Sequence, residues 1–445
     1  MREGRYKSYL LAVLLTIFAF NFVDRLALGL VLQDIKSELH LSDTQLGFLS
    51  GLAFALFYSV MGIPIARVAD RGNRVAIIAI TAAIWSVMVA LCGSAVSFVQ
   101  LLLIRVGVGI GEAGCIPPAH SLIADTFTRT ERPRAAAIYM LGAPLSFVIG
   151  SFLAGWLNQF YGWRVTFVVL GTPGLVLAAV AWFTLREPRG AKSSLLPVGE
   201  VGIRSARPRV FQPKLKDVCV SLGANATFRS LVLTISVSYF FGYGLLQWQP
   251  AFFVRSYGLG TGEIGTWFSL IYGLGGMIGA YMGGALASRY AGGNERLQLK
   301  AMAIAYSSSG LLSALVYLSH NLYVTFGLLT IASIGGYSVY GPLFATIQTL
   351  VPGHMRAISI ALVYLVANLL GMGLGPLAAG ALSDALRPWT GHESLRYALL
   401  AFSPGYLLAA WYSWRASQTV HRDVAAAHAS EDAHALDRVD VITVS

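Results

Sequence analysis

The chain has 445 residues, of which 56% are hydrophobic and only 12% charged, and its formal net charge is +11. Soluble domains carry about 25% charged residues, so this composition excludes a water-soluble globular protein. The apolar residues fall in blocks of about 20, the length at which a helix crosses a ~30 Å hydrocarbon core, and they lack the alternation of barrel strands.

Taken in chain order, the apolar blocks predict twelve membrane-spanning helices, separated by Gly, Pro and charged residues. The first block is too long for the hydrophobic region of a signal peptide and contains charged residues, so we expect it to remain as the first span. The expected limits are 9–33, 44–68, 75–95, 98–123, 135–157, 163–184, 230–253, 263–287, 299–319, 322–347, 357–382 and 395–415.

Most Lys and Arg residues fall on one side of these spans if the N-terminus is inside, and few fall in the opposite loops. The positive-inside rule therefore predicts that both termini are cytoplasmic. The same placement explains the net positive charge, so we expect no nucleic-acid partner.

The longest interruption separates two sets of six spans that repeat weakly, as two halves related by an axis along the membrane normal would. We predict an all-α integral membrane protein with two pseudo-symmetric six-helix bundles. The expected parts are an N-terminal bundle at 1–185, a cytoplasmic linker at 186–229, a C-terminal bundle at 230–415 and a disordered tail at 416–445.

Four charged residues fall inside predicted spans: Asp24 and Arg25 in the first, and Arg105 and Glu112 in the fourth. A charge at a helix centre costs about 2.5–3.5 kcal/mol on insertion scales, so such residues are usually paired and functional. We expect Glu112, with Asp24, to carry a coupled proton, Arg25 to be the responding counter-ion and Arg105 a supporting charge. The alternative is a permanent salt bridge that only fixes helix packing.

Two further features surround this charge layer. Asp70, Arg71 and Arg74 form a short charged loop after the second span, which is either a cytoplasmic gate or an ordinary solvated loop. Aromatic and amide residues in the C-terminal half favour a cavity for an amphipathic ligand over simple packing, with the charged N-terminal half holding its headgroup. With Asn21, the predicted cavity residues are Tyr243, Gln247, Trp248, Tyr337, Tyr340 and Asn368.

Sequence signals for catalysis are missing. Two GxGxxG matches, beginning at Gly109 and Gly260, do not follow a strand, and no phosphate-binding loop or zinc-binding helix motif occurs. The three cysteines form no CxxC pair. We therefore expect no enzyme activity, no cofactor and no metal.

The twelve spans, the Asp70-Arg71 loop, Arg105 with its glycines and Gly142-Ala-Pro144 resemble the major facilitator superfamily over nearly the whole chain. More narrowly, Asn21-Phe-Val-Asp24-Arg25 and Gly111-Glu112-Ala113-Gly114 resemble the bacterial Spinster subfamily, as do Pro117-Pro118-Ala119 and Ile123-Ala-Asp125-Thr-Phe127. The loop departs from the family pattern, because Ala66 stands where Gly is usual.

The resemblance implies a secondary transporter with the major facilitator fold, in the bacterial inner membrane, in which Asp24, Arg25 and Glu112 take part in coupling. Animal Spinster proteins transport sphingolipid phosphates or lysophospholipids. We therefore expect a proton-coupled transporter of an amphipathic organic anion or lipid-like substrate, surrounded by membrane lipids and monomeric. An uncoupled facilitator or lipid flippase is one alternative, and a receptor-like sensor on a transporter scaffold is another.

Overall fold

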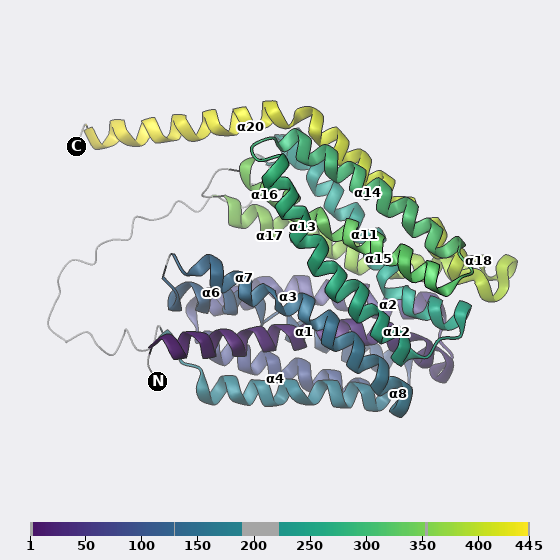
Figure 1. The fold of residues 1–445 in the computed structure, drawn as a ribbon. Coiled ribbons are helices and arrows are strands. Elements are labelled where there is room, and N and C mark those ends of the chain that lie inside the picture. Colours follow the sequence, from purple (N-terminus) through teal and green to yellow (C-terminus); the bar gives the residue numbers. More distant parts are fainter. Residues whose placement is uncertain (1–2, 129, 189–221, 352–354, 444–445) are drawn as a thin grey trace. The chain divides into compact units, whose positions relative to one another are not determined.

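The computed structural model describes residues 3–128, 130–188, 222–351 and 355–443. Over these residues the chain is helical and contains no strand (Figure 1). This confirms the predicted all-α class. Most of the predicted linker, residues 189–221, lies outside the described residues.

Ten helical stretches in the described ranges are long and apolar enough to cross a membrane. Two of them, Arg134–Thr184 with 51 residues and Ile358–Ala426 with 69, far exceed the ~20 residues of one crossing. The first breaks at Gly162, where φ is 77° and ψ is 168°, and the second at Gly391, where φ is 57°. Each therefore holds two crossings, so the described residues cross the membrane twelve times, as predicted.

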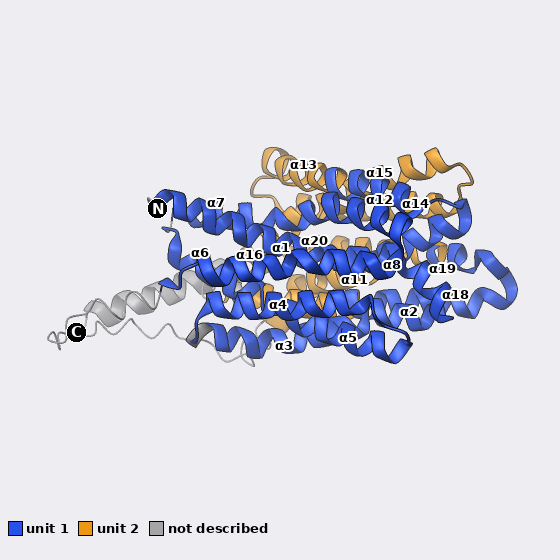
Figure 2. Ribbon diagram, turned by 90° about the horizontal axis from the view of Figure 1, so that it is seen from below, with its two compact units in different colours: residues 1–201, 242–274, 372–399 blue, residues 202–241, 275–371, 400–445 orange. Residues whose placement is uncertain are grey.

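The chain forms two compact units (Figure 2). Unit 1 contains Met1–Val201, Gly242–Leu274 and Met372–Leu399, and unit 2 contains Gly202–Phe241, Gly275–Gly371 and Leu400–Ser445. Unit 1 therefore combines the first six spans with parts of later ones. The predicted boundary at 186–229 does not coincide with this division and stays a prediction.

Unit 1 is built on the long helices α1 (Glu3–Leu39) and α8 (Gly142–Thr184). The last part of α11 (Ala226–Tyr257) and the first part of α19 (Ser394–Phe402) also belong to it. Its other elements are α2 (Asp43–Ser50), α3 (Leu52–Arg71), α4 (Arg74–Cys92), α5 (Phe98–Glu112), α6 (Ile116–Thr126), α7 (Arg132–Met140), α12 (Thr261–Phe268), η1 (Ser269–Leu274), α18 (Gly375–Thr390) and η3 (Gly391–Glu393).

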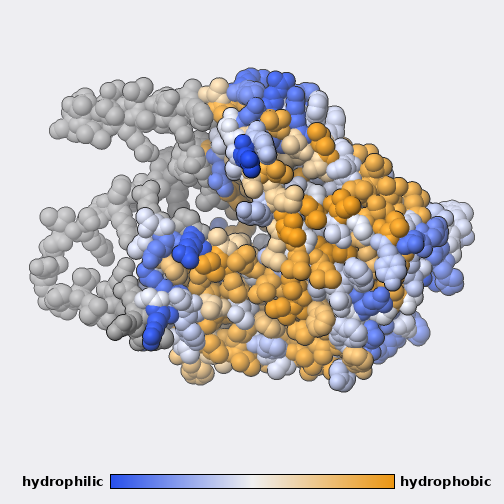
Figure 3. Space-filling view, viewed as in Figure 1, coloured by the Kyte–Doolittle hydropathy of each residue, from blue (hydrophilic) through white to orange (hydrophobic). Residues whose placement is uncertain are grey.

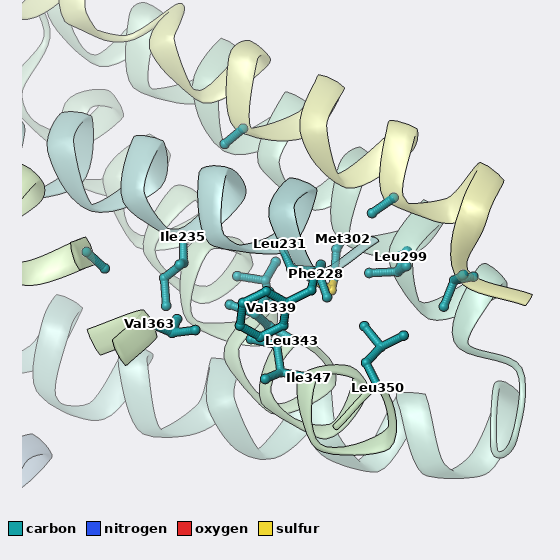
Figure 4. Close-up of a cluster of buried hydrophobic side chains, with 14 of the residues drawn as sticks. Phe228, Leu231, Ile235, Leu299, Met302, Val339, Leu343, Ile347, Leu350 and Val363 are labelled. Carbon is teal, nitrogen blue, oxygen red and sulfur yellow. The ribbon is translucent and has the colours of Figure 1, made fainter. Parts of the chain in front are cut away.

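Unit 2 contains the first part of α11 and the helices α13 (Gly275–Tyr290), α14 (Glu295–Leu318), α15 (Leu322–Ser338), α16 (Tyr340–Thr349), α17 (Arg356–Ala367), most of η2 (Asn368–Leu374) and α20 (Gly405–Thr443). Buried aliphatic and aromatic side chains join these helices in one core (Figure 4). Phe228 and Leu231 from α11 meet Met302 from α14, Leu343 from α16 and Val363 from α17 there.

Hydrophobic side chains cover much of the visible surface in Figure 3. Phe183 is 82% exposed, Tyr281 78% and Ile304 67%. A soluble monomer rarely exposes large contiguous apolar areas. These side chains are therefore suited to contact lipid.

Polar residues between the spans cap the helices that follow them. The side chains of Ser42, Asn73, Ser97, Asn294 and Asn321 each accept a hydrogen bond from a backbone N–H in the first turn of the next helix. These caps satisfy backbone donors that the helix cannot satisfy itself. The polar residues that separate the apolar blocks of the sequence therefore mark the starts of helices in the structure.

Several spans that the sequence predicts as continuous are interrupted in the structure. The predicted span 98–123 breaks after Glu112, because Pro117 and Pro118 cannot donate backbone hydrogen bonds and so begin a new helix, α6. The π-helical segments η1 and η2 interrupt two other spans. Such interruptions are frequent at functional sites.

Glycines bring helices of unit 1 into backbone contact. A Cβ atom on Gly155 of α8 would lie 2.4 Å from the carbonyl oxygen of Thr261 at the start of α12, and one on Gly265 would lie 2.2 Å from the carbonyl oxygen of Ser151. Small residues at these positions let the helix backbones approach closely. Pro144 lies in the first turn of α8, directly after the interruption between α7 and α8, where proline is tolerated.

The last helix is longer than the sequence predicts. The tail from residue 416 was expected to be disordered, whereas α20 continues to Thr443. Residues 416–443 are rich in Ala and contain neither Gly nor Pro, which favours helix even without an apolar face.

Asp423 in this extension caps the start of α11. Its Oδ2 accepts hydrogen bonds from the backbone N–H of Thr227 at 2.9 Å and from the Thr227 hydroxyl at 2.8 Å. Replacing Asp423 with Ala removes the acceptor, and we expect a loss of about 1 kcal/mol in the free energy of unfolding. Thermal unfolding in detergent measures the loss. The exposed neighbour His421 provides the control: equal midpoints for Asp423→Ala and His421→Ala would contradict the cap.

Candidate functional site

The four charged residues predicted from the sequence meet in unit 1. Arg105 Nη1 of α5 donates to Asp24 Oδ2 of α1 at 2.9 Å. Arg25 Nε of α1 donates to Glu112 Oε2 of α5 at 2.7 Å, and its Nη2 lies 2.5 Å from the same oxygen. Two acids and two bases thus pair crosswise between two helices.

The two pairs differ in their exposure. Asp24, Arg105 and Glu112 are at most 2% exposed, whereas the Arg25 side chain is 14% exposed. Asp24 also lies close enough to Glu112 for the two carboxyl groups to interact. Asp24 Oδ1 and Glu112 Oε1 are buried without a hydrogen-bond partner among the described residues. Each carboxyl group therefore keeps one oxygen free to take a proton.

Aromatic rings surround the Arg25 guanidinium group. Its Cζ lies 4.3 Å from the ring centre of Phe22, 4.6 Å from that of Phe54 and 4.7 Å from that of Tyr58. Cation–π attraction acts within about 6 Å. The rings therefore stabilise the cation without neutralising its charge.

A cavity in unit 1 borders this charge layer. Its polar lining comes from Arg25, Arg105, Ser50, Ser151, Tyr243 and Gln247, and its apolar lining from Phe22, Leu26, Gly29, Leu30, Phe54, Phe147, Leu246, Pro250, Phe268, Met372 and Pro376. Both arginines reach the wall, and the described lining includes no carboxylate. The cavity is therefore positive at one place and apolar over most of its surface.

The predicted cavity residues of unit 1 are only partly in its wall. Tyr243 and Gln247 line it. Trp248 is buried and does not line the cavity, but its Nε1 donates at 2.8 Å to the carbonyl oxygen of Pro376, which does. Asn21 is fully buried, and neither amide atom has a hydrogen-bond partner among the described residues.

The other predicted cavity residues belong to unit 2. Tyr340 lines a separate pocket with Tyr239, Gly341, Phe344 and Tyr364. The Tyr337 ring centre lies 6.0 Å from that of Tyr340. Asn368 is partly buried at the start of η2. Their part in a common substrate site stays a prediction.

Arg74, predicted as part of the cytoplasmic gate, is fully buried at the start of α4. Its Nη1 donates to Asp125 Oδ2 at 2.7 Å and to the Ser121 carbonyl oxygen at 2.9 Å, and its guanidinium group also binds the Glu187 carboxylate. Arg74 thus ties α4 to α6 and to the segment after α8. Asp70 and Arg71 lie in the last turn of α3, and their side chains lie outside the described part of the structure.

A second charge cluster, at the opposite end of unit 1, was not predicted. Asp43 at the start of α2 is 2% exposed and accepts from Arg255 Nη1 at 2.8 Å and Nη2 at 2.7 Å. Lys36 pairs with the same carboxylate. The sequence signal was available, because Lys36 and Arg255 are among the few basic residues in predicted outer loops.

Asp384 of α18 forms further hydrogen bonds at this end of unit 1. Its carboxylate accepts from the backbone N–H of Asp43 at 3.1 Å and of Thr44 at 2.7 Å. A carboxylate at a helix N-terminus satisfies free donors and interacts favourably with the helix dipole. Residues from α1, α2, α11 and α18 are thereby joined at the predicted outer face.

Outside the spans, Glu131 precedes α7 and pairs with Lys7 Nζ at 2.9 Å. Hydrogen bonds from Lys7 and Thr128 lower the pKa of Glu131 to about 2. The group is exposed, so the pair is weak. Its small contribution is present above the unfolded pKa of 4.5 and disappears as the pH falls toward 2.

A family model described as Major Facilitator Superfamily matches residues 13–376 of the chain. The chain belongs to the major facilitator superfamily. An MFS-type efflux pump of Mycolicibacterium smegmatis is 32% identical over 429 residues, which cover 95% of this chain and 96% of the relative. Protein spinster homolog 1 of Xenopus tropicalis is 27% identical over 89% of this chain and 78% of its own length.

A solved structure supports the same family assignment. A bacterial homolog to the human lysosomal transporter Spinster, in an inward-facing and unoccupied conformation, matches with a TM-score of 0.81 and 31% identity, covering 94% of this chain and 98% of the other. This major facilitator protein is therefore a multi-pass membrane transporter, not an enzyme, and is similar to Spinster proteins. The resemblance predicted from the motifs of the first and fourth predicted spans is confirmed.

Proposed function

We propose that this transporter couples the movement of an amphipathic organic anion to protons by alternating access. The observation that carries the proposal is the crosswise pairing of Asp24 with Arg105 and Arg25 with Glu112 beside a cavity lined by both arginines. We further propose an inner-membrane location, cytoplasmic termini and a monomeric state.

Glu112 and Asp24 are the proposed proton carriers. A proton placed between Asp24 Oδ1 and Glu112 Oε1 uses two oxygens that have no other partner among the described residues. It also reduces the attraction of Glu112 for Arg25, whose guanidinium group already faces the cavity. Proton binding and anion binding are thereby linked, because a released Arg25 binds an anionic ligand more strongly.

The cavity supports an anionic headgroup with an apolar tail. Among its described lining residues, Gln247 Nε2 and Arg105 Nε are buried donors without a partner. Unpaired donors favour a ligand that offers acceptor oxygens, as carboxylates and phosphates do. The apolar majority of the wall suits an alkyl or aromatic tail, as in a lysolipid or sphingolipid-like substrate.

Reconstitution into liposomes with an internal pH-sensitive dye tests the proposal. Lysolipids, sphingosine phosphate and small organic anions are offered in turn, and substrate-dependent proton movement is compared between the wild type and Glu112→Gln. We expect the substitution to abolish proton movement, because an amide takes up no proton at neutral pH.

The exposed Glu263 at the start of α12 provides a matched control, and Glu263→Gln should behave as the wild type. Full transport by Glu112→Gln with unchanged pH dependence would contradict proton coupling. It would instead favour an uncoupled facilitator or lipid flippase.

A further inference from the structure

We propose that His120 passes protons between Glu112 and the cytoplasmic solution. This inference rests on the proposed role of Glu112 as a proton carrier. Glu112 is 0% exposed, so its proton cannot exchange directly with bulk water. His120 lies further along the same span, on α6, and its side chain is exposed.

The break in the span provides polar groups between the two residues. Pro117 and Pro118 have no N–H, so the carbonyl oxygens of Ala113 and Gly114 receive no hydrogen bond from α6. Buried carbonyl groups that lose their helical donor bind another polar group or water. These two carbonyls follow Glu112 directly and lie on the chain toward His120.

Among the described residues, no acidic group forms an ion pair with the imidazole ring of His120. Its centre lies 5.2 Å from the ring centre of Tyr139 on α7, which in turn stacks on Phe18 of α1 at 4.7 Å. The next acid on α6, Asp125, is bound to Arg74. His120 is thus the first group after Glu112 on this span that ordinarily gains and loses a proton near neutral pH.

The step conserves charge and atoms. The Glu112 carboxyl group gives up its proton through water to the free imidazole nitrogen of His120, which forms an imidazolium cation. The imidazolium then releases a proton to the cytoplasmic solution and returns to its neutral form. The same steps in reverse bring a proton to Glu112.

The test measures substrate-dependent proton movement in liposomes that contain His120→Ala, His120→Asn or wild-type protein. We expect both substitutions to slow proton movement by about tenfold or more, since a positioned proton-transfer group commonly contributes at least this much. Added imidazole should restore most of the rate, because it can replace the missing side chain. Substrate exchange at equal pH on both sides should remain, which shows that the variants are folded.

The exposed His320 gives the matched control, and His320→Ala should move protons as the wild type does, with no response to imidazole. A wild-type rate in both His120 variants would overturn the inference. A slow rate that imidazole does not restore would also overturn it and assign His120 a structural role. Glu112→Gln, measured in parallel, separates the two proposals: if it alone stops proton movement, Glu112 carries the proton and His120 is not its relay.

Discussion

Replacing Asp24 with Asn is expected to destabilise the protein by about 3–5 kcal/mol, the usual cost of leaving one member of a buried ion pair alone. Arg105 is 1% exposed and donates to Asp24 Oδ2 at 2.9 Å. Removing the Asp24 carboxylate therefore leaves a buried arginine without its charged partner. The measurement is the midpoint of thermal unfolding in detergent, together with the yield of folded protein from membranes.

The double variant Asp24→Asn/Arg105→Gln is the control for this prediction. It removes both charges and leaves two neutral amides, so it should recover a large part of the lost stability. A single variant as stable as the wild type, or a double variant no better than the single, would show that the pair does not stabilise the fold.

Glu112→Gln should be less destabilising than Asp24→Asn. Its partner Arg25 remains 14% exposed and retains its three aromatic neighbours, so the unpaired cation is less costly there. The comparison of the two variants distinguishes the Asp24–Arg105 pair, which mainly holds two helices together, from the Arg25–Glu112 pair, which can open.

Replacing Gly283 with Ala is expected to cost about 1–3 kcal/mol, as overpacking of a tight contact usually does. A Cβ atom at this position of α13 would lie 1.9 Å from the carbonyl oxygen of Ser338 and 2.6 Å from its Cα. These are backbone atoms of α15, so no side chain can rotate away and the two helices must separate. Thermal unfolding in detergent measures the effect.

The adjacent residue Gly284 is a matched control. A Cβ atom there would have no heavy atom of another described element within 4 Å. Gly284→Ala should be neutral or stabilising by up to about 1 kcal/mol, because Ala favours helix more than Gly. Equal losses for the two variants would contradict the close approach of α13 and α15.

The number of spans and the all-α class were predictable, because hydrocarbon thickness sets the length of an apolar helix. The interruptions were harder to find. Pro117 and Pro118 marked the break after Glu112, but the π-helical segments η1 and η2 carry no proline. Their geometry depends on packing with neighbouring helices, which a single sequence does not contain.

The charge layer was predictable for a similar reason, since charges are rare in the middle of a membrane. The pairing within this layer was only partly predictable. The four residues were expected to act together, but the sequence did not indicate that Asp24 binds Arg105 and Arg25 binds Glu112. The Asp43 cluster was missed because its members come from helices far apart in the chain and lie near span ends, where charge is ordinary. Arg74 was singled out, but its partners Asp125 and Glu187 were not.

The composition of unit 1 has a consequence for synthesis of the protein. Unit 1 includes Met372–Leu399 as well as the first six spans, so the partners of Asp43 and Thr44 on α18 emerge from the ribosome roughly 200 residues after the sixth span. At ~5–20 residues per second, the first six spans wait about 10–40 s in the membrane before this contact can form. During that interval the N-terminal face of α2 is uncovered, and a nascent chain stalled before residue 372 should remain open to proteases at that face.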